Sequence, residues 1–431
     1  MVDQKLWLVV VALLAYFTSQ AISYRKRTTF CEKNGCKPPP AVPQKWWLFG
    51  IDNISKLTNW AKDRTFLKEF NNLFKESGSH TISMNLSGMN VYWTMSPENA
   101  KAMMASMADD FQLSQLRLDG FEPYIGDGVA ASNGATWAHG RTILRPSFSK
   151  AQVSNSDLYE RHFQELVMNI PTDGSTVELR ALFSRLTLDV ATEIIFGESI
   201  RSLQPDAPQS TREIDEAFDL ASKGCRDRFN LGPFMFLHRD PQFKRAIKIL
   251  NEYTSTIIDN ALRDKELSKG REKDVESLGG KIVFLDELVK DSSDKKRIRD
   301  LLLNAFLGGR DTTSGLLSHV FINLSRHKSV LKKLREEISQ LRGVPPTYEQ
   351  FKDLKYLRWV IDESKFLNRS NCTDKTSSAF RLTPPAPIWD REAKRDLVLP
   401  NGGGPDGKSP LFVPKGQGIT YVFYSLCHSE E

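Results

Sequence analysis

Cysteine and histidine are both scarce in this chain of 431 residues, and neither follows a known pattern. The five cysteines are too few and too scattered for a disulfide framework, which fits a reducing compartment. The seven histidines show no metal-ligand spacing, so no metal site is expected. Aromatic-interleaved basic runs are also absent, and the net charge of +6 is mild, which excludes nucleic acid as an expected partner.

One stretch has no charged residues and is long enough to cross a bilayer as a helix. Leu6–Tyr24 is uncharged and lies between Lys5 and the cluster Arg25-Lys26-Arg27. Because the basic cluster follows the apolar run, the positive-inside tendency places the body of the protein in the cytosol. We expect residues 1–24 to form a single-pass membrane anchor. A signal peptide cleaved near Ser19-Gln20-Ala21 is the alternative.

A basic and proline-rich hinge is expected over residues 25–45. Its prolines, between Lys37 and Pro43, favour a stiff extended form that either spaces the body from the membrane or only marks a boundary. Residues 46–431 read as one mainly α domain with a small β portion. Helices are expected over residues 97–108, 157–169, 177–196, 210–223, 243–265, 295–325, 328–340 and within 348–364, and strands over 90–95, 397–399, 411–413 and 419–423.

The segment Ala305–Gly315 (AFLGGRDTTSG) is unusual for the interior of an apolar helix. Glycine inside a helix costs about 1 kcal/mol relative to alanine. Gly308 and Gly309 therefore indicate a loosened turn against which something fits, and Asp311 and Thr312 beside it could hold water and pass protons. The alternative is an ordinary core helix, with glycines for close packing and Thr312 bonded back to the preceding turn.

Trp137 and Arg141, in GATWAHGRTILRPSF, are four residues apart and share one face of a predicted helix. A guanidinium beside an indole suits a buried planar ligand that bears a carboxylate, because arginine makes paired charged hydrogen bonds. A cation–π pair on the protein surface is the alternative.

Residues Gly402–Ser409 (GGGPDGKS) match the phosphate-binding pattern G-x-x-x-x-G-K-[ST]. That loop requires a strand before it and a helix directly after it. Leu397–Leu399 could supply the strand, but Pro410 and a strand-like run follow Ser409. A nucleotide-binding protein is therefore kept only as the alternative function of a different class.

Taken together, these motifs resemble the cytochrome P-450 haem-thiolate monooxygenases. Trp137 and Arg141 match the family's W-x-x-x-R helix, whose arginine pairs with a haem propionate. Gly308–Thr313 matches its [AG]-G-x-[DE]-T-[TS] oxygen-binding helix, in which the acid and the threonine help deliver protons. The resemblance implies an incomplete P-450 fold with an N-terminal membrane anchor, catalytic roles for Asp311 and Thr312, and cofactor contacts at Trp137, Arg141, Gly308 and Gly309.

Within that family, LRPSFSK, GGRDTT and REAKRDLVLPNGGGPDGKSPLFVPKGQGITY are similar to fungal membrane-bound hydroxylases of n-alkanes and fatty acids. This likeness implies insertion of one oxygen atom from O2 into a long-chain apolar substrate, near a chain end. It also implies electrons from an NADPH-dependent flavoprotein reductase in the endoplasmic reticulum membrane. In that group the triglycine segment is a loop between strands.

The chain departs from the family at its E-x-x-R helix, whose pair locks the shell around the haem-binding loop. The residue three after Glu363 is Phe366, and the expected continuation resumes at Arg381. Removing residues 366–380 restores the motif, so an in-frame unspliced intron is one hypothesis. The polar insert should break the helix, and Glu363 and Arg381 can pair only if it loops out.

A second departure concerns the haem iron, which the family holds by a cysteine thiolate in F-x-x-G-x-R-x-C-x-G. None of the cysteines lies in that context; they are Cys31, Cys36, Cys225, Cys372 and Cys427. We therefore expect a P-450 domain truncated before its ligand cysteine and inactive in this form. A non-catalytic remnant of the family is the alternative.

Overall fold

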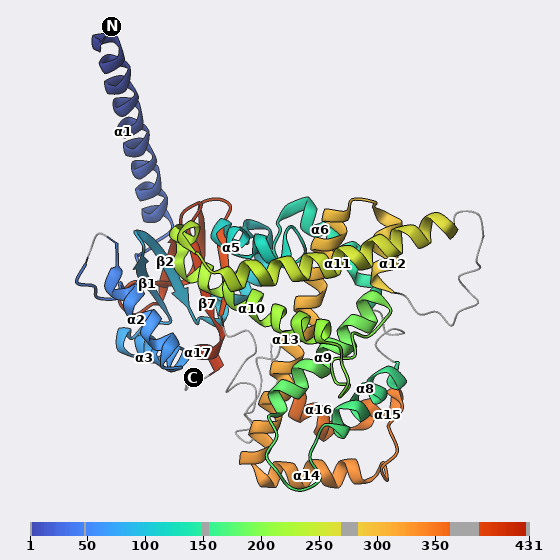
Figure 1. The fold of residues 1–431 in the computed structure, drawn as a ribbon. Helices are drawn as coiled ribbons and strands as arrows, with labels where there is room; N and C mark the ends of the chain where they lie inside the picture. The colour runs from blue at the N-terminus through green and yellow to red at the C-terminus, as the bar shows by residue number, and fades with distance from the viewer. Residues whose placement is uncertain (1, 47–48, 149–154, 269–282, 363–387, 428–431) are drawn as a thin grey trace. The chain divides into compact units, whose positions relative to one another are not determined.

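The computed structural model describes all residues except 1, 47–48, 149–154, 269–282, 363–387 and 428–431 (Figure 1). The chain divides into two compact units. Unit 1 comprises Met1–Gln112 and Pro387–Glu431, and unit 2 comprises Leu113–Ala386.

Unit 1 is built on a five-stranded sheet in which strands from the N-terminal part of the chain pair with strands from its C-terminal part. The strand order is β1-β2-β7-β4-β3, with β2 and β7 parallel and the other pairs antiparallel. The strands are β1 (Thr81–Leu86), β2 (Met89–Thr94), β3 (Phe111–Gln112), β4 (Ile388–Ala393) and β7 (Gly418–Val422). The helices are α1 (Val2–Lys33), α2 (Ile51–Lys62), α3 (Phe66–Ser77), α4 (Pro97–Lys101) and α17 (Phe423–Cys427). The strands predicted over 90–95 and 419–423 correspond to β2 and β7.

The predicted anchor segment Leu6–Tyr24 lies within α1, which continues through the basic cluster to Lys33. Across the part of the chain that the structure describes, no helix combines the length and apolarity needed to cross a membrane. The anchor predicted from the sequence is therefore not confirmed.

The proline-rich segment is extended, as predicted, and it is also bound to the sheet. The Val42 N–H donates to the Ser83 carbonyl at 2.8 Å, and the Ser83 N–H donates to the Pro40 carbonyl at 2.8 Å. Ala41 and Ser83 form a parallel bridge. The segment is thus paired along β1, which leaves little of it to act as a free spacer.

The helix after β2 begins where the sequence predicts and ends earlier. The Ser96 hydroxyl accepts the Asn99 N–H, which caps α4. The α-helix stops at Lys101, and Ala102–Ser106 continues as a π-helical turn in which the Met107 N–H donates to the Ala102 carbonyl. The wider turn replaces the last part of the helix predicted over residues 97–108.

The phosphate-loop match Gly402–Ser409 lies in an antiparallel hairpin. It connects β5 (Leu397–Gly403) to β6 (Ser409–Val413), and Gly403 pairs with Ser409. A strand, not a helix, begins at Ser409, so the helix that the phosphate-binding pattern requires directly after the loop is not formed. Left-handed backbone at Gly404 and Gly407 allows the turn.

Unit 2 is helical, and most of its helices match the predicted ranges. They are α5 (Gln115–Ile125), α6 (Gly134–Leu144), α8 (Ser156–Met168), α9 (Leu179–Phe196), α10 (Gln209–Leu231), α11 (Pro241–Ser268), α12 (Phe284–Asp291), α13 (Lys295–Arg326), α14 (Lys328–Ser339), α15 (Tyr348–Asp353) and α16 (Lys355–Asp362). The helix α10 extends beyond its predicted end at Lys223, and the sequence pattern missed α5 and α12.

The helix α13 is unbroken, and the loosened turn predicted at its two glycines is not present. A Cβ on Gly309 would lie 3.4 Å from the Ala191 Cβ, whereas a Cβ on Gly308 would meet nothing within 4 Å. Both positions therefore have room for a Cβ, and the one on Gly309 would be in ordinary van der Waals contact with Ala191. Tertiary packing along the helix outweighs the intrinsic cost of the two glycines.

Three phenylalanine rings hold the core of unit 2 together. Phe306 of α13 is fully buried, and its ring stacks on Phe218 of α10 with centroids 4.1 Å apart. Phe196 of α9 stacks on Phe306 from 6.2 Å. These rings connect α13, which carries Asp311 and Thr312, to α9 and α10.

Replacing Phe306 with alanine should lower the free energy of unfolding by about 3–5 kcal/mol, because the cavity left between packed rings cannot collapse. Chemical denaturation of the full chain measures this change. Phe236→Ala is the matched control, since Phe236 is 63% exposed and should cost little. Equal losses in the two variants would contradict this account of the core.

Candidate active site

The centre of the polar site on α13 is Arg310, a residue that the sequence analysis did not single out. Its guanidinium is 3% exposed and reaches from α13 to α10. Nη2 donates to Asp215 at 2.6 Å, and Nη1 donates to Asp219 and to Asp311 at 2.9 Å each. The guanidinium also lies over the Phe218 ring, 5.8 Å from its centroid. One buried cation thus holds three carboxylates and an aromatic face.

Electrostatics keep this guanidinium charged. Burial alone would lower its pKa, but Asp219, Asp215 and Asp311 together outweigh burial and raise the pKa of Arg310 above its ordinary value. The charge therefore persists at every pH at which the protein is folded.

The partners of Arg310 on α10 share one helix face. Asp215, Asp219 and Ser222 follow one another at spacings of four and three residues, which places them in a row. This row is the sequence signal that could have identified the network. It faces α13 because Arg310 pairs with the two aspartates, while the Ser222 hydroxyl donates to Asp311 at 3.3 Å.

Asp311 is therefore fixed from two helices while remaining 40% exposed. Behind it lies Tyr124 of α5, which is buried and hydrogen-bonded to Ser222. Burial first, and then the charge of Asp311, raise the pKa of Tyr124 above its ordinary value, so this phenol stays protonated. The arrangement presents an accessible carboxylate supported by neutral hydroxyls.

Thr312, the other predicted catalytic residue, is exposed, and its hydroxyl donates to the Gly308 carbonyl at 2.6 Å. This is the bond to the preceding turn that the sequence analysis kept as the alternative. It occupies the hydroxyl proton and leaves the oxygen lone pairs as acceptors.

Trp137 and Arg141 lie on α6, as predicted, and contact each other. The Arg141 guanidinium carbon is 5.7 Å from the Trp137 ring centroid, and Trp137 is 41% exposed. This is the surface cation–π geometry considered as the alternative. The remaining predicted pair, Glu363 and Arg381, lies outside the described residues.

An apolar cavity of about 540 Å³ lies between α8, α9 and α13. Gly309 and Thr313 of α13 line it, together with Val190 of α9 and Phe163 of α8. Asp311 and Thr312 are not among its lining residues, because they occupy other faces of the same helix.

Comparison with known proteins decides the family. A sequence profile described as Cytochrome P450 matches residues 40–431. The chain belongs to the cytochrome P450 family. It is 34% identical over 429 residues to cytochrome P450 monooxygenase fsdH of Fusarium heterosporum, covering 97% of this chain and 72% of that protein. It is 33% identical to cytochrome P450 52A13 of Debaryomyces hansenii, over 99% and 80% of the two chains, and 33% identical to cytochrome P450 52A3-B of Candida maltosa, over 97% and 79%.

P450 enzymes are monooxygenases that carry haem, held by a cysteine thiolate. The cysteines whose side chains are described do not meet that need. Burial raises the pKa of Cys225 to about 12, so it is a thiol in the apolar core of unit 2. Burial also raises the pKa of Cys31 and Cys36, which are in unit 1. The described residues therefore do not complete a thiolate-ligated haem site.

Removing the guanidinium should separate α10 from α13. We expect Arg310→Met to lower the free energy of unfolding by about 2–3 kcal/mol, less than for a fully buried pair because Asp219 and Asp311 keep contact with water. Arg310→Lys should lower the free energy of unfolding less, because lysine keeps the positive charge although it lacks the paired N–H donors of the guanidinium. Urea unfolding measures both, with exposed Arg180→Met as the control. If Arg310→Met and Arg180→Met lower the free energy of unfolding equally, the Arg310 network does not stabilise the fold.

Proposed function

We propose that this P450 chain is of the type that hydroxylates n-alkanes and fatty acids, inserting one oxygen atom from O2 into a long-chain apolar substrate. The observation that carries the proposal is the fixed position of Asp311 on the unbroken helix α13, beside Thr312. The proposal is supported by the sequence similarity of GGRDTT and of residues 391–421 to that group of hydroxylases. It is also supported by the relatives named cytochrome P450 52A13 and 52A3-B. Electrons would come from an NADPH-dependent flavoprotein reductase.

In this proposal Asp311 exchanges protons with solvent. Arg310 and Ser222 hold its carboxylate in place, and its exposed part remains in contact with water. The Thr312 oxygen, whose proton is donated to the Gly308 carbonyl, can accept a hydrogen bond from a water shared with Asp311. The pair thus delivers protons along one side of α13. Nucleotide binding at Gly402–Ser409 is not proposed, since that segment is a hairpin turn.

We further propose that the 431-residue chain does not by itself form thiolate-ligated haem. No cysteine lies in the family's ligand motif, and Cys225 is held as a buried thiol. Arg141 would still pair with a haem propionate by charged hydrogen bonds.

Titration of the purified chain with haemin tests both statements. The carbon monoxide-bound reduced form should lack a thiolate-type Soret band. Any haem that binds should bind about tenfold more weakly to Arg141→Ala, the loss expected when a charged hydrogen bond is removed. Arg145→Ala, at an exposed position directly after α6, is the matched control. A thiolate band would contradict the first statement, and equal weakening in the two variants would contradict the second.

We also propose that the Leu6–Tyr24 segment attaches the protein to the endoplasmic reticulum membrane, with the body in the cytosol. The support is an uncharged run within α1 whose apolar side chains, including Val11 and Leu14, are exposed. The chain should float with phospholipid vesicles in a density gradient. Val11→Asp with Leu14→Asp should abolish flotation, because each central aspartate costs about 2.5–3.5 kcal/mol in a membrane helix. Flotation that survives both charges would refute attachment through this segment.

A further inference from the structure

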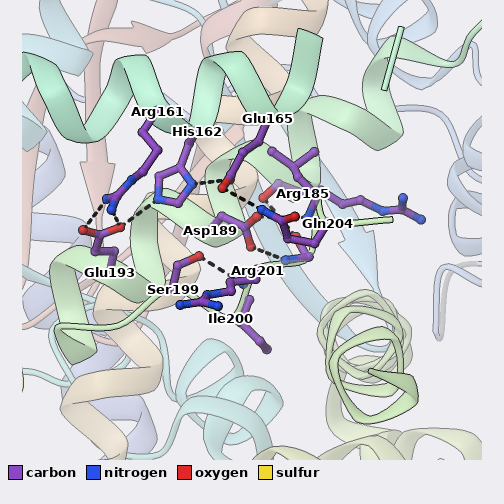
Figure 2. A network of polar contacts seen from close by, with 12 residues as sticks. Arg161, His162, Glu165, Arg185, Asp189, Glu193, Ser199, Ile200, Arg201 and Gln204 are labelled. Carbon is purple, nitrogen blue, oxygen red and sulfur yellow. Dashed lines mark hydrogen bonds and ion pairs between the residues drawn. The ribbon is translucent and has the colours of Figure 1, made fainter. Parts of the chain in front are cut away.

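A second polar cluster, outside the site on α13, connects α8 to α9 within unit 2 (Figure 2). His162 and Glu165 project from α8 toward Asp189 and Glu193 of α9. His162 is 2% exposed, and Asp189 and Glu193 are also buried. Neither the family's known site nor the proposed function uses these residues.

Both ring nitrogens of His162 face carboxylate oxygens. Its Nε2 lies 2.8 Å from Glu193 Oε2, and its Nδ1 lies 2.9 Å from Glu165 Oε2. Ionised carboxylates only accept, and a neutral imidazole has a single N–H. If Nε2–H donates to Glu193, then the Nδ1 lone pair faces a carboxylate oxygen. A proton on Nδ1, or a metal ion bound by both atoms, removes this repulsion.

The net negative charge of the cluster favours a bound cation that carries more than one positive charge. Three carboxylates, Glu165, Asp189 and Glu193, face one guanidinium, that of Arg161, which donates to both oxygens of Glu193 at 2.6 Å. With a neutral histidine, the three carboxylates and the guanidinium of Arg161 together carry a net charge of −2.

The cluster also has the geometry of a ligand set. One atom each from His162, Glu165 and Asp189 lie within 4.8 Å of one another. A zinc ion holds nitrogen and oxygen ligands at about 2.0–2.2 Å, so binding would draw the Asp189 carboxylate inward and spread the His162–Glu165 contact slightly.

Groups around the cluster orient each ligand. Gln204 donates to Glu165 Oε1 at 2.8 Å, and the backbone N–H groups of Ser202 and Leu203 donate to the two oxygens of Asp189. With a metal on Nδ1, His162 Nε2–H would donate to Glu193, which lies 2.8 Å away. A carboxylate behind a histidine is the usual second layer of a metal site.

We propose that His162 Nδ1, Glu165 and Asp189 bind a divalent transition-metal ion of the zinc class, with water completing the coordination. The ion would join α8 to α9 and so fix the α8 wall of the apolar cavity, which Tyr159 and Phe163 line.

Calorimetric titration of the full, chelator-stripped chain with Zn²⁺ tests the site. One ion should bind per chain, and the thermal unfolding temperature should rise with Zn²⁺. Glu165→Gln and His162→Gln should each weaken binding at least tenfold. Glu160→Gln removes the same charge from the same helix, outside the three ligands, and should leave binding unchanged.

Co²⁺ in place of Zn²⁺ identifies the donor atoms by its visible spectrum. Ligand-field bands of a nitrogen and oxygen site, without thiolate charge transfer, are expected. Thiolate charge-transfer bands would place the metal on cysteines and overturn the proposal. Absence of binding would leave only a proton between His162 and Glu165, and would also overturn it. If His162→Gln does not fold, unchanged affinity in Glu165→Gln still refutes the site.

Discussion

The pairing of the Arg310 guanidinium with three aspartates is the constraint on which the site on α13 depends. It crosses from α13 to α10, fixes Asp311, and lies against Phe218, whose ring also packs on Phe306. The polar and the apolar contacts between these two helices are therefore continuous. Asp311 is held in this continuous set of contacts by Arg310 and Ser222.

Helical periodicity predicted most of unit 2 because long amphipathic segments depend mainly on local pattern. Where it failed, tertiary contacts decided the outcome. The two glycines of α13 predicted a loosened turn, yet α13 is regular through both of them and packs along α9. Pro40 and Val42 likewise form backbone hydrogen bonds with Ser83 at the edge of β1, a pairing that no local sequence pattern predicts.

The site was only partly predictable for a similar reason. The motif identified Asp311 and Thr312, and Trp137 and Arg141 lie together on α6 as their spacing predicted. Arg310 occupies the variable position of the motif, so its importance emerges only when α10 supplies Asp215 and Asp219. His162 and Glu165 are three residues apart, but Asp189 joins them from another helix. Groups brought together by packing leave a weak signal in the sequence.

A double-mutant cycle between Arg310 and Asp215 tests the central claim most directly. The free energies of unfolding are compared for Arg310→Met, Asp215→Asn and the double variant of the full chain. The account predicts a coupling energy of about 1.5 kcal/mol or more, because the pair is short and largely removed from water. A coupling energy near zero would show that the guanidinium does not tie α10 to α13, and would contradict the account.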